Sequence, residues 1–236
     1  MSSEENGPEG FVELVRQIFC TDQFIPLHAP RFSAQDKLFV CDAIDSTFVS
    51  SVGAYVDKFE NQLIDTTGAK FAVATSTGTA ALHVALLLAG VEQGDEVITQ
   101  TLTFVATCNA IRYCGADPVF VDIERSTLGM SPDALLNFLD ETSEIRGDGG
   151  CWNRNTGRRI RACLPVNNLG HPARVDEIAK VCELFNVKVI EDAAESLGSI
   201  RNRQHTGLAG QLGILSFNGN KIITTGGGGM ILTNDK

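Results

Sequence analysis

From Phe71 onward, short apolar or β-branched runs alternate with amphipathic segments, and few folds accommodate such an alternation. The predicted strands span residues 71–75, 96–99, 118–122, 161–166, 187–191 and 212–217. The predicted helices, which carry apolar residues at helical spacing, span residues 78–89, 104–114, 131–139 and 175–185. Strands that alternate with helices form parallel sheets with helices on both faces. The sequence therefore predicts an α/β fold with a mostly parallel sheet.

The first part of the chain has a different pattern. Residues 11–19 and 52–66 have helical periodicity, and Ser33 is suited to cap a helix that continues to about Asp45. We expect an N-terminal helical segment over residues 1–67, followed by one large domain over residues 68–236. Within this domain, the glycine- and asparagine-rich residues 143–159 predict an exposed excursion or hairpin.

Composition disfavours several classes of protein. The 236 residues include 29 Asp+Glu against 19 Lys+Arg, a formal net charge of -10 that argues against nucleic-acid binding. The 7 cysteines form no C-x-x-C pair and the 4 histidines show no ligand spacing, so we expect neither a disulfide framework nor a metal. No apolar run approaches the length of a bilayer span and the acidic start has no signal-peptide pattern, so we expect a cytoplasmic protein without a membrane partner.

Two predicted strands end in groups that can bind a ligand. Strand 71–75 leads into Ser76-Thr77-Gly78-Thr79-Ala80-Ala81, which begins a helix, and the N-terminus of a helix binds anions such as phosphate. The same residues could instead only cap the helix. Strand 187–191 delivers Asp192 to the edge where open parallel sheets place their ligand groups. Asp192 is therefore either a functional acid or a helix cap.

A lysine and an aromatic residue complete this set. Lys221 follows strand 212–217 within Ser216-Phe217-Asn218-Gly219-Asn220-Lys221 and precedes the glycines at 226–229, and such strand-end loops commonly hold reactive groups. Phe104, in the next strand-to-helix connection, either stacks on a flat ring or belongs to the core. An anion cradle, a carboxylate, an aromatic and a lysine match pyridoxal phosphate, whose aldehyde the lysine would hold. A plain nucleotide-binding domain is disfavoured because both phosphate-loop motifs are missing.

These motifs also identify a family. The runs Ser216 to Lys221, Thr224 to Met230, Glu191 to Ala194 and Ser76 to Ala81 resemble the DegT/StrS-type sugar-nucleotide aminotransferases, which depend on pyridoxal phosphate and have fold type I. The resemblance runs from about Ile25 to the end of the chain. It implies the large domain of an aspartate aminotransferase-like fold and a homodimer in the full-length form. The run Ile44 to Gly53 resembles the branch that acts on UDP-4-keto-6-deoxy-N-acetylhexosamines.

The resemblance assigns roles to individual residues. It implies that Lys221 is the Schiff-base lysine, that Asp192 meets the pyridine nitrogen and that Phe104 stacks on the ring. It places Gly78, Thr79 and Ser216 on the cofactor phosphate. Glu195 stands where many members have glutamine near the ring hydroxyl.

Two departures from the family pattern bear on specificity and activity. Asn167 and Leu169 stand where many relatives have a histidine and an aromatic, which puts the substrate subtype in question. The chain also stops at Lys236, whereas members continue into a small C-terminal domain that helps to hold the nucleotide sugar and to form the dimer. We therefore expect this chain to correspond to a truncated large domain that lacks the small domain.

The implied reaction moves an amino group in two halves. L-Glutamate gives its amino group to the cofactor, which then aminates a keto nucleotide sugar, and Lys221 moves protons as a general acid and base. A pyridoxal phosphate-dependent sugar dehydratase is one alternative, although such enzymes often have histidine at the lysine position. The other alternative is a non-catalytic, truncated aminotransferase homologue.

Overall fold

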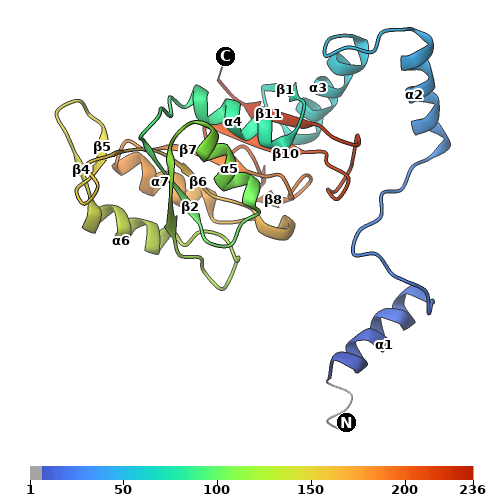
Figure 1. Cartoon of the computed structure of the whole chain (residues 1–236), viewed down its shortest axis with the longest axis horizontal. Helices are drawn as coiled ribbons and strands as arrows, with labels where there is room; N and C mark the ends of the chain where they lie inside the picture. Colours follow the sequence, from blue (N-terminus) through green and yellow to red (C-terminus); the bar gives the residue numbers. More distant parts are fainter. Residues whose placement is uncertain (1–6, 236) are drawn as a thin grey trace. The chain divides into compact units, whose positions relative to one another are not determined.

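The computed structural model describes residues 7–235 and divides the chain into two compact units, residues 1–31 and 32–236 (Figure 1). In the first unit, helix α1 (Pro8–Phe19) has proline at its start and ends at Cys20, which adopts the left-handed conformation. The second unit holds the sheet together with α2 (Ala34–Asp45) and α3 (Ala54–Thr67). The predicted boundary between a helical segment and a large domain after residue 67 stays a prediction. In the structure, α2 and α3 fall within the same unit as the sheet.

The second unit is built on a nine-stranded sheet. Its main path follows the order β1 (Phe71–Thr75), β11 (Gly229–Thr233), β10 (Leu212–Ser216), β7 (Lys188–Asp192), β6 (Arg159–Leu164), β2 (Glu96–Gln100) and β3 (Asp117–Val121). Along this path, each strand from β10 to β3 is parallel to the next one. Strand β11 runs antiparallel to both of its neighbours, β1 and β10. The predicted α/β fold with a mostly parallel sheet is confirmed.

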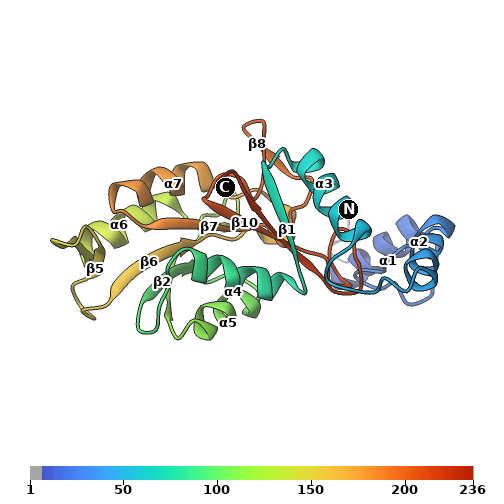
Figure 2. The same cartoon turned by 90° about the horizontal axis from the view of Figure 1, so that it is seen from above.

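Helices cover both faces of this sheet (Figure 2). On one face, α4 (Gly78–Leu88) and α5 (Val105–Tyr113) bury an apolar cluster that includes Leu86 and Ile111. On the other, α6 (Pro132–Thr142) and α7 (Val175–Leu184) bury a cluster that includes Leu135 and Ile178. Burial of both faces explains why consecutive residues of β7, Val189 and Ile190, are both apolar and belong to the clusters on opposite faces.

Side-chain caps begin three of the helices, and one of them is the predicted cap Ser33. Ser33 and Asp36 form a reciprocal capping box at the start of α2. The Thr77 side chain accepts a hydrogen bond from the Ala80 N–H at the start of α4, and Ser131 does the same for Ala134 at α6. These bonds satisfy N–H groups that have no partner within the helix, so local sequence sets these boundaries.

Two hairpins extend the fold. Strands β4 (Ser143–Ile145) and β5 (Cys151–Asn153) form the predicted hairpin. The hairpin is not wholly exposed, however, because β5 also pairs with β6 and the buried Asn153 side chain donates to the Glu96 carboxylate at 2.8 Å. A second hairpin, β8 (Ile200–Arg201) with β9 (Gln204–His205), is too short to leave a periodic pattern.

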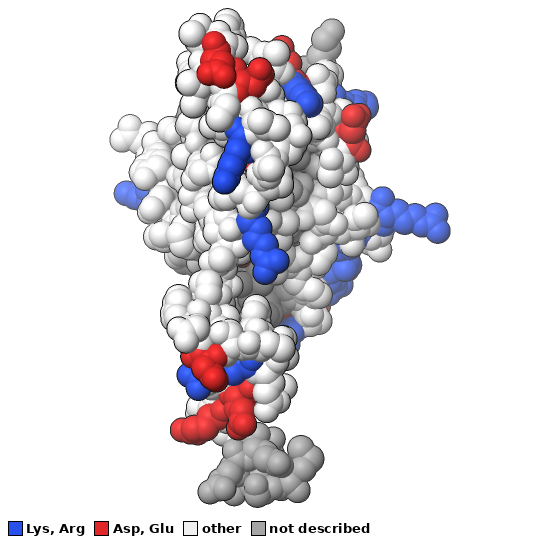
Figure 3. Space-filling view, turned by 90° about the vertical axis from the view of Figure 1, so that its right-hand side faces the viewer, with Lys and Arg blue, Asp and Glu red and all other residues white. Residues whose placement is uncertain are grey.

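On the face shown in Figure 3, acidic and basic side chains are scattered among wide uncharged areas. Among residues 7–235, none of the helices combines the length and the apolar character needed to cross a bilayer.

Candidate active site

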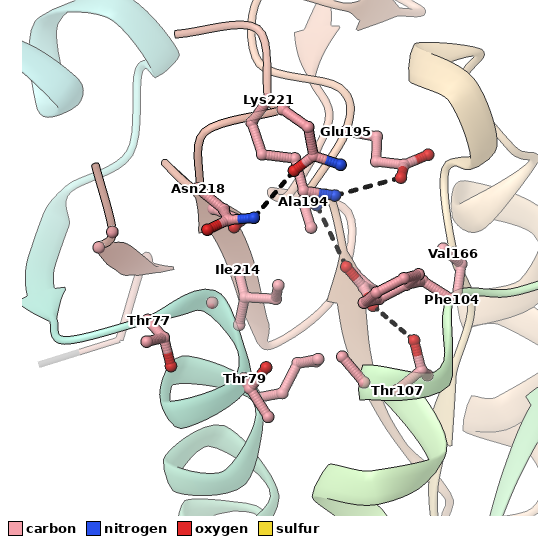
Figure 4. A pocket seen from close by; sticks show the side chains of 18 of the residues that line it. Thr77, Thr79, Phe104, Thr107, Val166, Ala194, Glu195, Ile214, Asn218 and Lys221 are labelled. Carbon is pink, nitrogen blue, oxygen red and sulfur yellow. Dashed lines mark hydrogen bonds and ion pairs between the residues drawn. The ribbon is translucent and has the colours of Figure 1, made fainter. Parts of the chain in front are cut away.

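The seven predicted site residues meet in one cavity of about 280 Å³. The carboxyl ends of β1, β10, β7 and β2 lie at the same edge of the sheet, because β1 and β10 both run antiparallel to β11 while the other pairs are parallel. The last residues of these strands and the segments that follow them supply the predicted residues Gly78, Thr79, Phe104, Asp192, Glu195, Ser216 and Lys221. The topology therefore brings together groups that lie far apart in the sequence (Figure 4).

The start of α4 forms one wall of the cavity. Gly78 and Thr79 occupy its first turn, where backbone N–H groups have no helical partner and the helix dipole favours an anion. Ser216, the last residue of β10, lies against this turn so closely that a Cβ on Gly78 would be 2.7 Å from the Ser216 Cβ. Thr77 also caps the helix, so capping and ligand binding are compatible here rather than alternatives.

Asp192 forms the floor of the cavity at the end of β7. Only 4% of this residue is exposed, and its two oxygens accept hydrogen bonds from the Thr107 hydroxyl at 2.9 Å and the Ala194 N–H at 3.1 Å. Burial raises the pKa of the Asp192 carboxyl, although both hydrogen bonds and the nearby Lys221 oppose that shift. A buried carboxylate that faces a cavity without a bonded cation suits a ligand that brings positive charge.

Lys221 reaches into the cavity from the turn after β10 (Figure 4). Its Nζ lies 3.1 Å from Glu195 Oε1 and 5.8 Å from the centroid of the Phe104 ring. The other Glu195 oxygen accepts a hydrogen bond from the Leu169 N–H at 2.8 Å. Phe104 is 67% exposed, so it is not a core residue, and its ring is accessible to a flat ligand.

Four polar residues line the cavity that sequence reasoning did not select. Thr107 lies one helical turn after Phe104, and Asn168 donates to the carbonyl oxygens of Leu102 and Leu128 at 2.9 and 2.8 Å. Asn218 donates to Asn220 at 3.0 Å beside Lys221. The spacing of Thr107 from Phe104 was a usable signal, whereas the Asn168 contacts depend on chain segments that are distant in sequence.

The two departures from the family pattern differ in position. Asn167 is fully buried and outside the cavity lining, with its side chain donating to Glu191 at 2.8 Å and accepting from the Ala173 N–H at 2.8 Å. Leu169 is 82% exposed in the left-handed conformation. The Asn167 side chain therefore contacts the residues around β7 and does not face the cavity.

The donor set fits pyridoxal phosphate. The α4 N-terminus with Ser216 provides a cradle for a phosphate, and Asp192 provides a partner for a protonated ring nitrogen. Lys221 is the amine that lies nearest to the exposed ring of Phe104 in this cavity. No added Cβ could enter between Gly78 and Ser216 without displacing one of them, which explains glycine at this position.

The sequence places the chain within a known family. Residues 31–236 match the DegT/DnrJ/EryC1/StrS aminotransferase family. The chain belongs to this family. A relative of this DegT-type chain, GDP-perosamine synthase of Escherichia coli O157:H7, is 39% identical over 91% of this chain and 54% of the relative.

Solved structures agree with this assignment. The aminotransferase from Psychrobacter cryohalolentis has a TM-score of 0.77 and 30% identity, covering 90% of this chain and 50% of that one. An E. coli GDP-4-keto-6-deoxy-D-mannose-3-dehydratase with bound hydrated PLP has a TM-score of 0.75 and 27% identity, and the match covers 90% of this chain and 51% of the dehydratase. The DegT-type chain thus has the fold of pyridoxal phosphate-dependent aminotransferases, and it spans about half the length of the relatives that it matches.

Proposed function

We propose that this chain forms the cofactor-binding part of a pyridoxal phosphate-dependent aminotransferase that transfers the amino group of L-glutamate to a keto nucleotide sugar. The observation that carries the proposal is the single cavity that holds Lys221, Asp192, Phe104 and the α4 N-terminus. Bound pyridoxal phosphate supplies an aldehyde and an electron-withdrawing ring. Family membership supports both the cofactor and the reaction class.

Each group of the cavity has a task in this proposal. Gly78, Thr79 and Ser216 would hold the phosphate, and Asp192 would pair with the ring nitrogen and favour its protonated form. Phe104 would stack on the ring, and Lys221 would supply the amine that binds the aldehyde and that acts as a general acid and base in amino transfer. Glu195 orients the Lys221 amine through their ion pair, and the family resemblance implies that it would contact the ring hydroxyl of the cofactor.

Lys221 also favours amino transfer over dehydration. The fold is shared with a sugar dehydratase that binds PLP, so the fold cannot separate the two reactions. A primary amine at position 221 can hold the aldehyde and return a proton to the amino-bearing carbon, which amino transfer requires.

The cofactor assignment is tested by absorbance spectroscopy of the purified chain with added pyridoxal phosphate. A visible band that shifts when L-glutamate is added is the expected result. Lys221→Ala should abolish the band and the borohydride-reducible protein adduct, whereas Lys180→Ala, on the exposed face of α7, should retain both. A band and a reducible adduct that persist in Lys221→Ala would refute the role of Lys221, and the absence of binding by the parent chain would favour a non-catalytic homologue.

The nucleotide sugar is the finer part of the proposal. The run Ile44 to Gly53 favours a UDP-4-keto-6-deoxy-N-acetylhexosamine, whereas the relative from E. coli O157:H7 is a GDP-perosamine synthase. Comparing the rates at which UDP- and GDP-linked 4-keto-6-deoxy sugars discharge the aminated cofactor separates the two. Faster discharge by the UDP sugar is expected, and a preference for the GDP sugar would reassign the branch.

We further propose a homodimer for the full-length form. No residue of α2 is buried, and its apolar side chains Leu38, Val40 and Ile44 are each about 60% exposed. Exposed apolar surface of this kind is typical of protein interfaces. The family resemblance supplies the identity of the partner, a second copy of the same chain.

A further inference from the structure

Asp192 is hydrogen-bonded to Thr107, which is bonded in turn to Thr103, and the proposed function uses neither threonine. Thr107 Oγ1 lies 2.9 Å from Asp192 Oδ2 and 2.7 Å from Thr103 Oγ1. Thr107 is 1% exposed, whereas Thr103 lies nearer the surface and its hydroxyl also contacts the Phe104 carbonyl at 3.3 Å. The two hydroxyls therefore form a short chain from the surface to the buried carboxylate. In Figure 4, Thr107 lies at the start of α5, directly below the Phe104 ring.

The direction of this chain depends on the charge of Asp192. An ionised carboxylate can only accept hydrogen bonds, so Thr107 must donate its single hydrogen to Asp192 and must accept from Thr103. A protonated carboxyl group could reverse both bonds, with the Phe104 carbonyl as the final acceptor. Both forms thus have a complete hydrogen-bond pattern, and the ionised form, which a protonated ring nitrogen requires, is the one in which Thr107 donates to Asp192.

The surroundings of Asp192 make such a donor necessary. Lys221 attracts the carboxylate across the cavity, while Glu195 beside the cavity and Glu191 in the same strand repel it. Burial further disfavours the charged form. The Ala194 N–H satisfies Oδ1 and the Thr107 hydroxyl satisfies Oδ2, so each oxygen has one internal donor. Loss of the Thr107 hydroxyl would leave one oxygen of a buried carboxylate without its donor.

We propose that Thr107 is a positioning residue, whose hydroxyl is oriented by Thr103 and holds the ionised Asp192 carboxylate in place at the floor of the cavity. The proposal rests on the proposed function only for the identity of the ligand that meets Asp192. Its hydrogen bonds belong to the chain itself and can be tested without a cofactor.

The first test measures the titration of Asp192 in the cofactor-free, full 236-residue protein by carboxyl ¹³C NMR, with the signal assigned through Asp192→Asn. Thr107→Val keeps the side-chain shape and removes the hydroxyl, so the pKa of Asp192 should rise above that of the parent. Thr107→Ser should restore the parent value. Thr99→Val is the matched control, because Thr99 is also fully buried but donates to the Leu164 carbonyl at 2.9 Å, outside the cavity lining. An Asp192 titration that is unchanged in Thr107→Val overturns the proposal.

The second test measures the dissociation constant of pyridoxal phosphate. Thr107→Val should weaken binding by about tenfold, the typical effect of one hydrogen bond to a charged group. Thr107→Ser should stay within about twofold of the parent, and Thr103→Val should fall between them. Equal losses in Thr107→Val and Thr107→Ser would indicate packing rather than the hydroxyl and would contradict the proposal. If the parent itself does not bind pyridoxal phosphate, the proposed function fails, and the NMR titration still decides the role of Thr107.

Discussion

At the scale of single residues, adjacent carboxylates on β7 have different tasks because side chains alternate along a strand. Asp192 faces the cavity, whereas Glu191 accepts hydrogen bonds from the Asn167 side chain at 2.8 Å and from the Ala209 N–H at 3.0 Å. Burial raises the pKa of the Glu191 carboxyl. Glu191 and Asn167 therefore join the segments before and after β7 and support Asp192 from behind.

Replacing Asn167 by aspartate should destabilise the fold in a pH-dependent way. The new carboxylate would repel Glu191 and could not donate to it, so the free energy of unfolding should fall by about 2 kcal/mol at pH 7. Both carboxyls would have pKa values raised above those of the unfolded chain, so protonation favours the folded state and stability should recover as the pH falls. Chemical denaturation at pH 7 and pH 5 measures this effect, with the exposed Asn155→Asp as control. An equal loss at both pH values would contradict the explanation.

At the scale of elements, β10 must approach the turn before it very closely to place Ser216 and Lys221. A Cβ on Gly213 would lie 1.9 Å from the Gly207 carbonyl oxygen, a distance that no packing tolerates. Gly207 itself has φ +91°, in the region that favours glycine. Two glycines thus allow the backbone contact that fixes β10 in the sheet.

Gly213→Ala should lower the free energy of unfolding by about 3 kcal/mol, because the strand or the turn must move to make room. Binding of pyridoxal phosphate should weaken as well, since β10 leads to Ser216 and Lys221. Thermal unfolding and cofactor titration measure the two effects. Gly147→Ala is the control, because a Cβ there meets open space. Comparable stability of both variants would show that β10 does not depend on this contact.

The β8–β9 hairpin should respond to acid through His205. The buried ring accepts a hydrogen bond from the Gly198 N–H at Nε2, 2.7 Å away, and burial lowers the pKa of His205 from 6.5. The unfolded chain therefore binds a proton more readily, and stability should be lost as the pH falls through about 6.5. Denaturation midpoints at pH 8 and pH 5.5 measure the loss, which His205→Gln should reduce. The exposed His171→Gln should leave it unchanged, and an equal effect of both variants would exclude His205 as the cause.

At the scale of the whole molecule, the second unit buries both faces of its sheet but leaves the apolar side chains of α2 exposed. The proposed homodimer would cover such surface. Because the chain spans about half the length of its relatives, α2 is a part of the possible interface that can be studied in this chain alone.

Self-association should depend on α2. Sedimentation of the chain should vary with concentration, and Val40→Glu with Ile44→Glu should remove this dependence by placing two charges on one helical face. The control pair Leu136→Glu with Leu184→Glu changes exposed apolar residues on α6 and α7. Loss of association in the control pair but not in the α2 pair would assign the interface elsewhere.

The sequence by itself determined the alternation of strands and helices, the caps at Ser33 and Thr77, and seven of the residues that line the cavity, because these signals are local or lie in short motifs. Only the tertiary structure decided that Thr107 bonds to Asp192 and that Asn167 turns away from the cavity toward Glu191. It also decided that β5 pairs with β6 and that β8 and β9 form a hairpin. These contacts join segments that are distant in sequence, and they follow from a strand order in which β7 lies between β6 and β10. Periodicity reports which face of an element is buried, but the partner across that face is chosen by the packing of the whole sheet.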